Sequence, residues 1–239
     1  MEKVFSGVQY VDAKCKKCDA DFKAGQWLSY RQDFCEKCSE YEIVQHDEQQ
    51  RREALEAKAQ RKLDRWRCIC PPLYQTTDLS RLPGVVRPAI DKVLGWECGP
   101  RGMVLHGETG LGKTRVAMMA LKGHHMAGLK VVPLLAGKFA YQVMTLLGES
   151  TSAFAAWYEG LIAADIVLLD DLGKEKMTER CETELFNLIE ERSQHLRPLI
   201  VTTNTVGDSL EDKLSDDRSG PLLRRVREFC EPVSFVVGE

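Results

Sequence analysis

One stretch of the chain has the residue types that bind nucleotide phosphates. Residues 107–114 match the phosphate-loop pattern G-x-x-x-x-G-K-S/T at every fixed position. Glycines allow the backbone N–H groups to point at a phosphate chain, and Lys113 is predicted to reach the β and γ phosphates while the Thr114 hydroxyl ligates Mg²⁺. The predicted ATP-binding residues are Gly107, Glu108, Thr109, Gly110, Leu111, Gly112, Lys113 and Thr114.

Two adjacent acids, Asp170 and Asp171, follow a run of apolar residues at 166–169. Four apolar residues in succession indicate a strand that is buried on both faces, as in a parallel sheet covered by helices. Acids at the carboxyl end of such a strand lie in the crevice where open α/β sheets bind ligands. This is a Walker B pattern, in which Asp170 is predicted to hold the Mg²⁺ shell and Asp171 to orient or polarise the attacking water.

Strand and helix patterns alternate through the rest of the chain from residue 73, which predicts a five-stranded, doubly wound parallel sheet with helices on both faces. Pro133 within the second strand indicates an edge position, because a central strand needs the missing N–H. The fourth strand ends in Asn204. In a P-loop enzyme with an additional strand, this strand lies between the phosphate-loop strand and the Walker B strand, so Asn204 is expected to touch the γ-phosphate or its water. The expected strands span residues 103–106, 130–135, 165–169, 198–204 and 233–237.

The N-terminal region has two C-x2-C pairs separated by sixteen residues: Cys15, Cys18, Cys35 and Cys38. This spacing predicts a tetrahedral zinc site with four thiolates, closed and therefore structural, in a small zinc-ribbon-like domain. The alternative is four unrelated core thiols. A segment of about 40 residues cannot bury enough apolar surface to fold alone, so the metal is expected to supply much of its stability.

A helical linker is predicted between the two domains. Residues 51–67 hold seven basic and three acidic side chains, a net charge of +4. A solvated helix whose apolar stripe (Leu55, Ala59, Leu63 and Trp66) rests on a neighbour is the simpler interpretation, and a helix that binds nucleic acid or a partner is the alternative. Cys68 and Cys70, next to Pro71, are interpreted as ordinary buried thiols.

Composition sets limits on the class of protein. The chain has 239 residues and a net charge of -3, so any surface for nucleic acid must be a local patch. The chain lacks an uninterrupted apolar run of about 18 residues and the apolar core of a secretory signal, so a cytoplasmic protein without a membrane partner is expected. We expect the nine cysteines to be reduced thiols or metal ligands.

Together these motifs resemble the AAA+ superfamily and, within it, the helicase loaders and transposition ATPases of the DnaC and IstB type. The resemblance rests on residues 107–114, 168–173, 201–205 and 223–226. It implies that Asn204 occupies the sensor 1 position and that Arg225, with Arg224 as the adjacent substitute, is an arginine finger that acts on ATP in a neighbouring subunit. A homo-oligomer that forms on ATP binding is therefore expected.

The resemblance also implies a replicative helicase as partner, contacted through residues 1–72, with single-stranded DNA as a further possible ligand. The expected cofactors are ATP, Mg²⁺ and Zn²⁺. The predicted domains are a zinc module (1–45), a basic helical linker (46–72) and an AAA+ ATPase domain without a C-terminal lid (73–239). One departure from the family pattern is Asp171, where many members carry Glu.

Three functions compete. An ATP-dependent helicase loader in DNA replication is the first, and a transposition ATPase of the same fold is the second. A zinc-dependent scaffold in which the nucleotide is only a structural ligand is the third. A small-molecule kinase ranks behind these three, because a lid segment with paired arginines for a second phosphate substrate is lacking.

Overall fold

The structure, a computed structural model, describes residues 8–27, 30–174, 177–204 and 224–236. The chain divides into two compact units, Met1–Arg61 and Lys62–Glu239. The boundary falls inside the long helix α1 (Glu36–Ile69). None of the helices in the described residues combines the length and the apolar character that a membrane span requires.

The first unit is a small antiparallel sheet followed by most of helix α1. Its strands lie in the order β1-β2-β3 and comprise β1 (Gln9–Lys14), β2 (Asp21–Trp27) and β3 (Tyr30–Arg31). A hairpin joins the first two strands and pairs Gln9 with Gln26. Among the residues of this unit whose exposure is described, only Cys15 and Ala24 are buried. Apolar burial alone therefore cannot stabilise this unit.

Helix α1 begins earlier than the linker predicted from the sequence. Its first residue is Glu36, so Cys38 lies in its first turn and the second cysteine pair marks the junction of loop and helix. All residues from 41 to 61 are exposed. The predicted apolar stripe is thus wrong for Leu55, which is 67% exposed, whereas Trp66 is 2% exposed.

The prediction that both thiols near the end of α1 are buried is wrong for Cys68. Cys70 is buried and Cys68 is exposed. The helical period explains the difference: Cys70 follows Trp66 by four residues and lies on the same buried face, while Cys68 follows it by two and points the other way.

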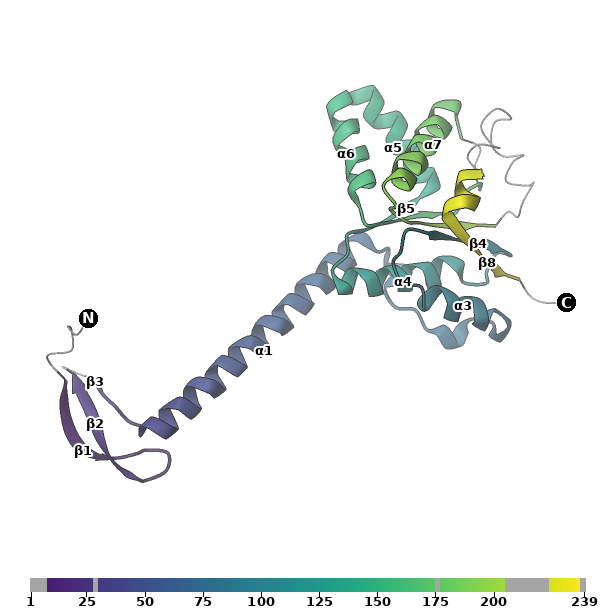
Figure 1. Cartoon of the computed structure of the whole chain (residues 1–239). Helices are drawn as coiled ribbons and strands as arrows, with labels where there is room; N and C mark the ends of the chain where they lie inside the picture. Colours follow the sequence, from purple (N-terminus) through teal and green to yellow (C-terminus); the bar gives the residue numbers. More distant parts are fainter. Residues whose placement is uncertain (1–7, 28–29, 175–176, 205–223, 237–239) are drawn as a thin grey trace. The chain divides into compact units, whose positions relative to one another are not determined.

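The second unit contains the predicted five-stranded parallel sheet, in the order β5-β6-β7-β4-β8. Figure 1 labels β4, β5 and β8 of this sheet. Its strands are β4 (Gly102–Gly107), β5 (Val131–Leu135), β6 (Ile166–Asp170), β7 (Leu199–Thr203) and β8 (Cys230–Phe235). The predicted edge position of Pro133 in β5 is confirmed, as is the place of β7 between the Walker B strand β6 and the phosphate-loop strand β4. Strand β8 begins at Cys230, three residues before the predicted start.

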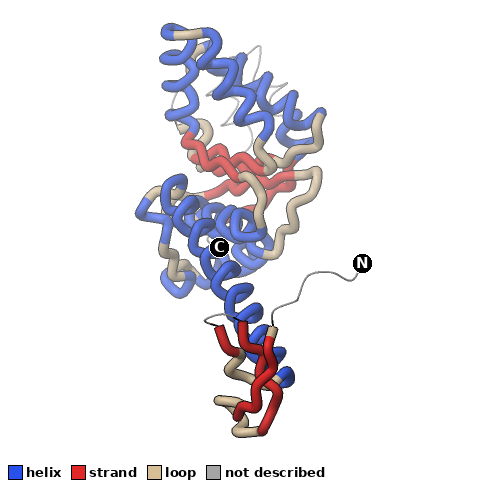
Figure 2. The backbone as a smooth tube through the Cα atoms, turned by 90° about the vertical axis from the view of Figure 1, so that its left-hand side faces the viewer, coloured by secondary structure: helices blue, strands red, loops and turns tan. Residues whose placement is uncertain are grey.

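Helices cover both faces of this sheet, as Figure 2 shows. One face carries α3 (Arg87–Leu94) and α4 (Lys113–Ala127), and the other carries α5 (Ala136–Glu149), α6 (Thr151–Ala163) and α7 (Glu179–Gln194). Two apolar clusters result, one on each face, and all five residues of β6 are buried between them. Helices α5 and α6 lie at residues 136–163, where no element was predicted.

Short elements connect the end of α1 to α3. They are α2 (Pro72–Gln75) and the 3₁₀ turns η1 (Leu79–Arg81) and η2 (Gly84–Val86). Asp78 caps η1, since its carboxylate accepts the backbone N–H of Ser80. This segment lies beside α4, where it forms one wall of a cavity next to the phosphate loop.

The buried Arg192 of α7 connects the end of α6 to the starts of strands β6 and β7. Arg192 of α7 is 0% exposed, and its guanidinium donates five hydrogen bonds to backbone carbonyl oxygens. The acceptors lie where α6 ends and where β6 and β7 begin: Leu161, Ile162, Ala164, Asp165 and Pro198. Burial lowers the pKa of Arg192 to about 10, and the side chain remains charged at neutral pH.

We expect Arg192→Met to destabilise the second unit by at least about 3 kcal/mol, because several buried carbonyl groups lose their donor at once. Thermal or urea unfolding monitored by circular dichroism measures the loss. Arg87→Met is the matched control, since its ion pair with Asp91 is 60% exposed on both sides and contributes at most about 1 kcal/mol. Equal stability of the two variants would contradict a structural role for Arg192.

Candidate nucleotide and metal sites

The phosphate loop connects the end of β4 to the start of α4. Gly107, Gly110 and Gly112 have positive φ angles of 125°, 87° and 89°. Close packing also restricts two of these glycines, strictly at Gly107, where the neighbour is backbone, and less so at Gly112, where it is the end of a flexible side chain. A Cβ at Gly107 would lie 2.0 Å from the Phe235 carbonyl oxygen, and one at Gly112 would lie 2.5 Å from a methyl group of Leu82. The loop conformation is therefore accessible only to a glycine-rich sequence.

Lys113 lies inside this loop and is 6% exposed. Its Nζ donates to the carbonyl oxygens of Gly107 at 2.9 Å and Glu108 at 2.7 Å. Burial lowers the pKa of Lys113, and the charges of Asp171 and Asp170 oppose that change. The ammonium group thus lies within the loop and faces both acids of the Walker B strand.

The Asp170 carboxylate joins three elements of the site. Its Oδ1 accepts a hydrogen bond from Thr114 Oγ1 at 2.7 Å and another from Thr202 Oγ1 at 2.6 Å. These hydroxyls come from the first turn of α4 and from β7. The structure therefore brings together Thr114 and Asp170, the two residues predicted to ligate Mg²⁺, and adds Thr202, which was not among the predicted site residues.

Burial raises the pKa of Asp170, and the hydrogen bonds from Thr202 and Thr114 oppose this shift. A divalent cation would favour the charged form further. Hydroxyl and carboxylate oxygens are the ligand types that Mg²⁺ prefers, so the residues present fit that ion.

Asp171 adopts a conformation that is rare for a residue with a side chain, with φ at +60°. Its backbone N–H donates to Thr202 Oγ1 at 2.9 Å, which fixes the turn after β6. Asn204 Nδ2 donates to Asp171 Oδ1 at 3.4 Å, and Lys174 Nζ lies 3.4 Å from Oδ2. The predicted Asn204 therefore contacts the predicted water-orienting acid across neighbouring strands.

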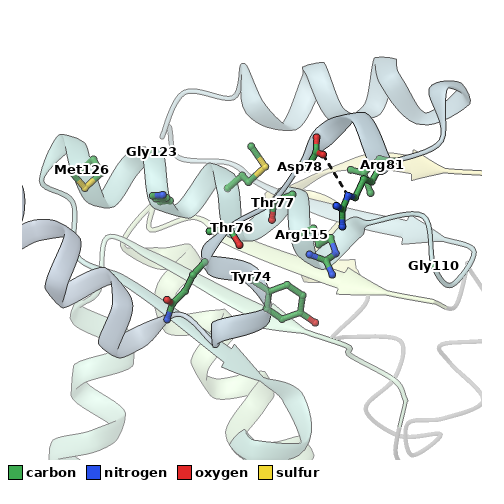
Figure 3. Close-up of a pocket in the computed structure, with 13 residues that line it drawn as sticks. Tyr74, Thr76, Thr77, Asp78, Arg81, Gly110, Arg115, Gly123 and Met126 are labelled. Carbon is green, nitrogen blue, oxygen red and sulfur yellow. Dashed lines mark ion pairs between the residues drawn. The ribbon is translucent and has the colours of Figure 1, made fainter.

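A cavity of about 860 Å³ extends along α4 from the phosphate loop. Figure 3 shows Gly110 at one end of this cavity and Met126 at the other, with Tyr74 and Arg115 beside it. The Arg115 guanidinium lies 5.7 Å from the centre of the Tyr74 ring and donates to the Leu73 carbonyl oxygen at 3.1 Å. The cavity is large enough for a nucleotide-sized ligand. Residues 73–82 gave no motif from which this wall could have been predicted.

The predicted arginine finger lies apart from this cluster. Arg225 is in a helical segment at 224–229, and its guanidinium forms a bidentate ion pair with Glu190 of α7 at 2.6 and 2.9 Å. A third bond joins it to Glu228 at 3.0 Å. The neighbouring Arg224 is exposed. Two residues of the motifs behind the resemblance, Thr205 and Leu223, lie outside the described residues.

The four predicted zinc ligands lie together in the first unit. The Sγ atoms of Cys15, Cys18, Cys35 and Cys38 are all within 4.8 Å of one another, and the Cys18–Cys35 distance is 3.7 Å. Tetrahedral zinc with Zn–S bonds of about 2.3 Å places sulfur atoms about 3.8 Å apart, so the cluster fits that ion. The first pair lies in the turn after β1 and the second at the start of α1.

The backbone around this cluster favours a thiolate at Cys15. Burial raises the pKa of the Cys15 thiol, but hydrogen bonds from the backbone of Cys35, Cys18 and Lys17 outweigh it and lower the pKa to about 6. A thiolate is the form that binds zinc, so the backbone around Cys15 prepares this ligand for the metal, whereas the side-chain hydrogen bond with Cys18 raises the pKa of the Cys38 thiol to about 12.

Comparison with known proteins connects this geometry to a family. The family model described as "Bacterial DnaA ATPAse domain" matches residues 95–218. None of the curated proteins matches the chain.

Among solved structures, AMPPCP-bound DnaA from Aquifex aeolicus superposes with a TM-score of 0.56 at 20% identity and covers 69% of this chain and 50% of its own. The DnaC helicase loader gives 0.54 at 18% identity, covering 72% and 98%, and DnaI gives 0.55 at 17%, covering 71% and 93%. The chain thus spans about half the length of the DnaA structures that it matches. These likenesses confirm the AAA+ type of fold predicted from the sequence.

For the zinc cluster, we expect about one zinc ion per chain in protein purified without a chelator. Cys15→Ser should lose the metal and destabilise the first unit, whereas Cys68→Ser, an exposed thiol outside the cluster, should retain it. Elemental analysis of the purified proteins decides this. Metal-free wild-type protein, or equal zinc in both variants, would show that the four thiols are not a zinc site.

For the nucleotide site, Thr202→Val removes one hydrogen bond to Asp170 and the acceptor of the Asp171 N–H. We expect hydrolysis to fall by about 10–100-fold while ATP binding changes little, because the acids lose their orientation. The acidic limb of the pH–rate profile should also move to higher pH, since a bond that holds down the pKa of Asp170 is gone.

Steady-state hydrolysis and ATP titration measure these effects. Thr183→Val is the control, because within the described part of the chain its hydroxyl donates to the Glu179 carbonyl oxygen of the same helix, α7, and takes no part in the nucleotide site. A Thr202→Val protein with the wild-type rate and pH profile would refute the positioning role of Thr202.

Proposed function

The chain belongs to the family of the bacterial DnaA ATPase domain, and from this membership we propose that it is an ATP-dependent loader of a replicative helicase in DNA replication. ATP binding and hydrolysis switch its assembly state. Two structural relatives support the proposal, because the DnaC helicase loader and DnaI are matched over 98% and 93% of their chains.

The observation that carries the proposal is the meeting of the phosphate loop and the Walker B acids through the Asp170 carboxylate. In the proposed mechanism Lys113 exchanges its carbonyl partners for the β and γ phosphate oxygens of ATP, while Thr114 and Asp170 hold Mg²⁺. Asp171 orients the attacking water, and Asn204 contacts that water or the γ-phosphate.

Hydrolysis in this proposal requires a second copy of the chain. Arg225 acts on ATP bound to the neighbouring subunit, with Arg224 as the adjacent alternative. An arginine supplied in trans increases the rate of hydrolysis by about 10³–10⁵-fold in comparable enzymes. In the single chain the Arg225 guanidinium is bound by Glu190, so a neighbour's phosphate has to compete with that carboxylate.

The zinc unit is the proposed contact with the helicase, as part of residues 1–72. Its small sheet presents Tyr10 and Tyr30 to solvent, with 69% and 68% exposure. Tyrosine side chains are among the residues that contribute most to protein interfaces, and the unit has few buried apolar residues that would need them for its own core. This exposure supports protein docking by the first unit.

A transposition ATPase and a nucleotide-bound scaffold share most of these features, and the response to nucleotide separates them. A scaffold would show the same assembly with ATP and ADP. A transposition ATPase would respond to double-stranded DNA and would not bind a helicase.

We expect the full-length protein to oligomerise with ATP and Mg²⁺ but not with ADP, and in the ATP state to retain a hexameric replicative helicase on affinity resin. Lys113→Ala should abolish nucleotide binding and both effects, because the phosphates lose their main cation. Lys92→Ala, which removes an exposed lysine that is paired with Glu231, is the control.

Size-exclusion chromatography with light scattering and helicase retention provide the two measurements. Assembly that does not depend on the nucleotide, or retention that is equal for wild type and Lys113→Ala, would refute the loader proposal.

A further inference from the structure

A second groove, of about 470 Å³, lies beside the edge strand β5, at the end of the sheet away from the nucleotide site. It is formed by the last turns of α1, the end of α4 and the start of β5. The nucleotide residues lie at the carboxyl ends of the parallel strands, whereas this groove lies at the amino end of β5. The motifs of the chain assign no role to it.

The groove combines cationic walls with an apolar floor. Lys62, Arg65 and Lys130 line it together with Ile69 and Leu129. Among the described residues that line it, none is an acid. All the charged side chains of the lining are thus cationic, which the overall composition does not explain, because the chain has a net charge of -3.

Part of this wall is fixed in place by hydrogen bonds. Lys62 Nζ donates to the Met126 carbonyl oxygen at 2.6 Å and so caps the end of α4, where cations are favoured by the helix dipole. His125 Nε2 lies 2.9 Å from the Lys62 carbonyl oxygen and donates to it. Lys62 therefore shapes the groove, and its charge is already partly satisfied.

Arg65 and Lys130 are the cations that remain for a ligand. Both side chains are exposed, and neither forms an ion pair with another residue that the structure describes. The carboxylate of Asp165, the residue before β6, accepts a hydrogen bond from the backbone N–H of Lys130 at 2.7 Å. Like charges around one groove repel one another, and an anion bound between them would remove that repulsion.

We propose that this groove binds the phosphodiester backbone of a single-stranded nucleic acid, an inference that rests on the proposed function in DNA replication. The volume admits one or two nucleotides and the apolar floor provides a surface for a base, while Arg65 and Lys130 contact phosphates. A flexible single strand can enter such a groove. In duplex DNA the bases are paired and stacked, so a base is not free to lie on the apolar floor while its phosphate contacts the cations.

The test compares two double variants with the same loss of charge. Arg65→Gln/Lys130→Gln removes the two groove cations, and Arg87→Gln/Lys92→Gln removes two exposed cations of α3 that are paired with surface acids. Lys62 is left unchanged because it caps α4. Fluorescence anisotropy with a labelled oligothymidylate of about 20 nucleotides measures the affinity of each protein between about 50 and 200 mM salt.

We expect the groove variant to bind the oligonucleotide roughly tenfold or more weakly, and the slope of log K against log salt to fall by about 1.4, because each lost phosphate contact in a single strand removes about 0.7. The control variant should keep the affinity and the slope of wild type. ATP-dependent assembly, measured on the same samples, should be unchanged in both variants.

A groove variant with the wild-type affinity and slope would overturn the proposal, as would an equal loss in the control or equal affinity of the wild type for duplex DNA. The loader proposal can fail independently of this one, because a protein that does not retain the helicase can still bind the oligonucleotide through the groove.

Cys68, an exposed thiol that lines the groove, provides a second measurement without substitution. The oligonucleotide should slow alkylation of Cys68 and leave the exposed Cys98 unaffected, as followed by mass spectrometry of the peptides. Equal alkylation of Cys68 with and without the oligonucleotide would contradict the proposed site.

Discussion

The candidate nucleotide site depends on one buried carboxylate. Asp170 is 6% exposed and accepts hydroxyl hydrogen bonds from Thr114 and Thr202, so it connects three elements that are distant in the sequence. Burial of an acid is unfavourable unless its oxygens are satisfied, and these two hydroxyls satisfy it before any metal binds. The order of strands follows the same requirement, since β7 has to lie beside β6 for Thr202 to reach Asp170.

The two units of the chain rely on different chemistry for their stability. The second unit buries apolar side chains on both faces of its sheet and uses Arg192 to satisfy the carbonyl groups where the layers meet. In its described residues the first unit has almost no apolar core, and its four clustered cysteines would supply stability by binding zinc. Loss of zinc should therefore unfold the first unit and leave the second intact.

Sequence patterns predicted the parts of the site that depend on local chemistry. The phosphate loop was found because glycine, lysine and threonine must occur at fixed spacing, and the edge position of Pro133 followed from its missing N–H. The hydrogen bond between Thr202 and Asp170 depends on the register between β6 and β7, and a sequence motif does not specify that register. The ion pair between Arg225 and Glu190 joins residues that are 35 positions apart in the sequence, so no local motif predicts it either. Helices α5 and α6 were not predicted because their sequences carry no motif.

The central claim is that Asp170 builds a Mg²⁺-dependent nucleotide site, and the coupling between Mg²⁺ and ATP tests it most directly. Calorimetric titration of ATP with and without Mg²⁺ gives that coupling for wild type and for Asp170→Asn. We expect Mg²⁺ to tighten ATP binding by about tenfold or more in wild type, a coupling of about 1.4 kcal/mol, and Asp170→Asn to lose this gain. An Asp170→Asn protein that keeps the full gain from Mg²⁺ would contradict it.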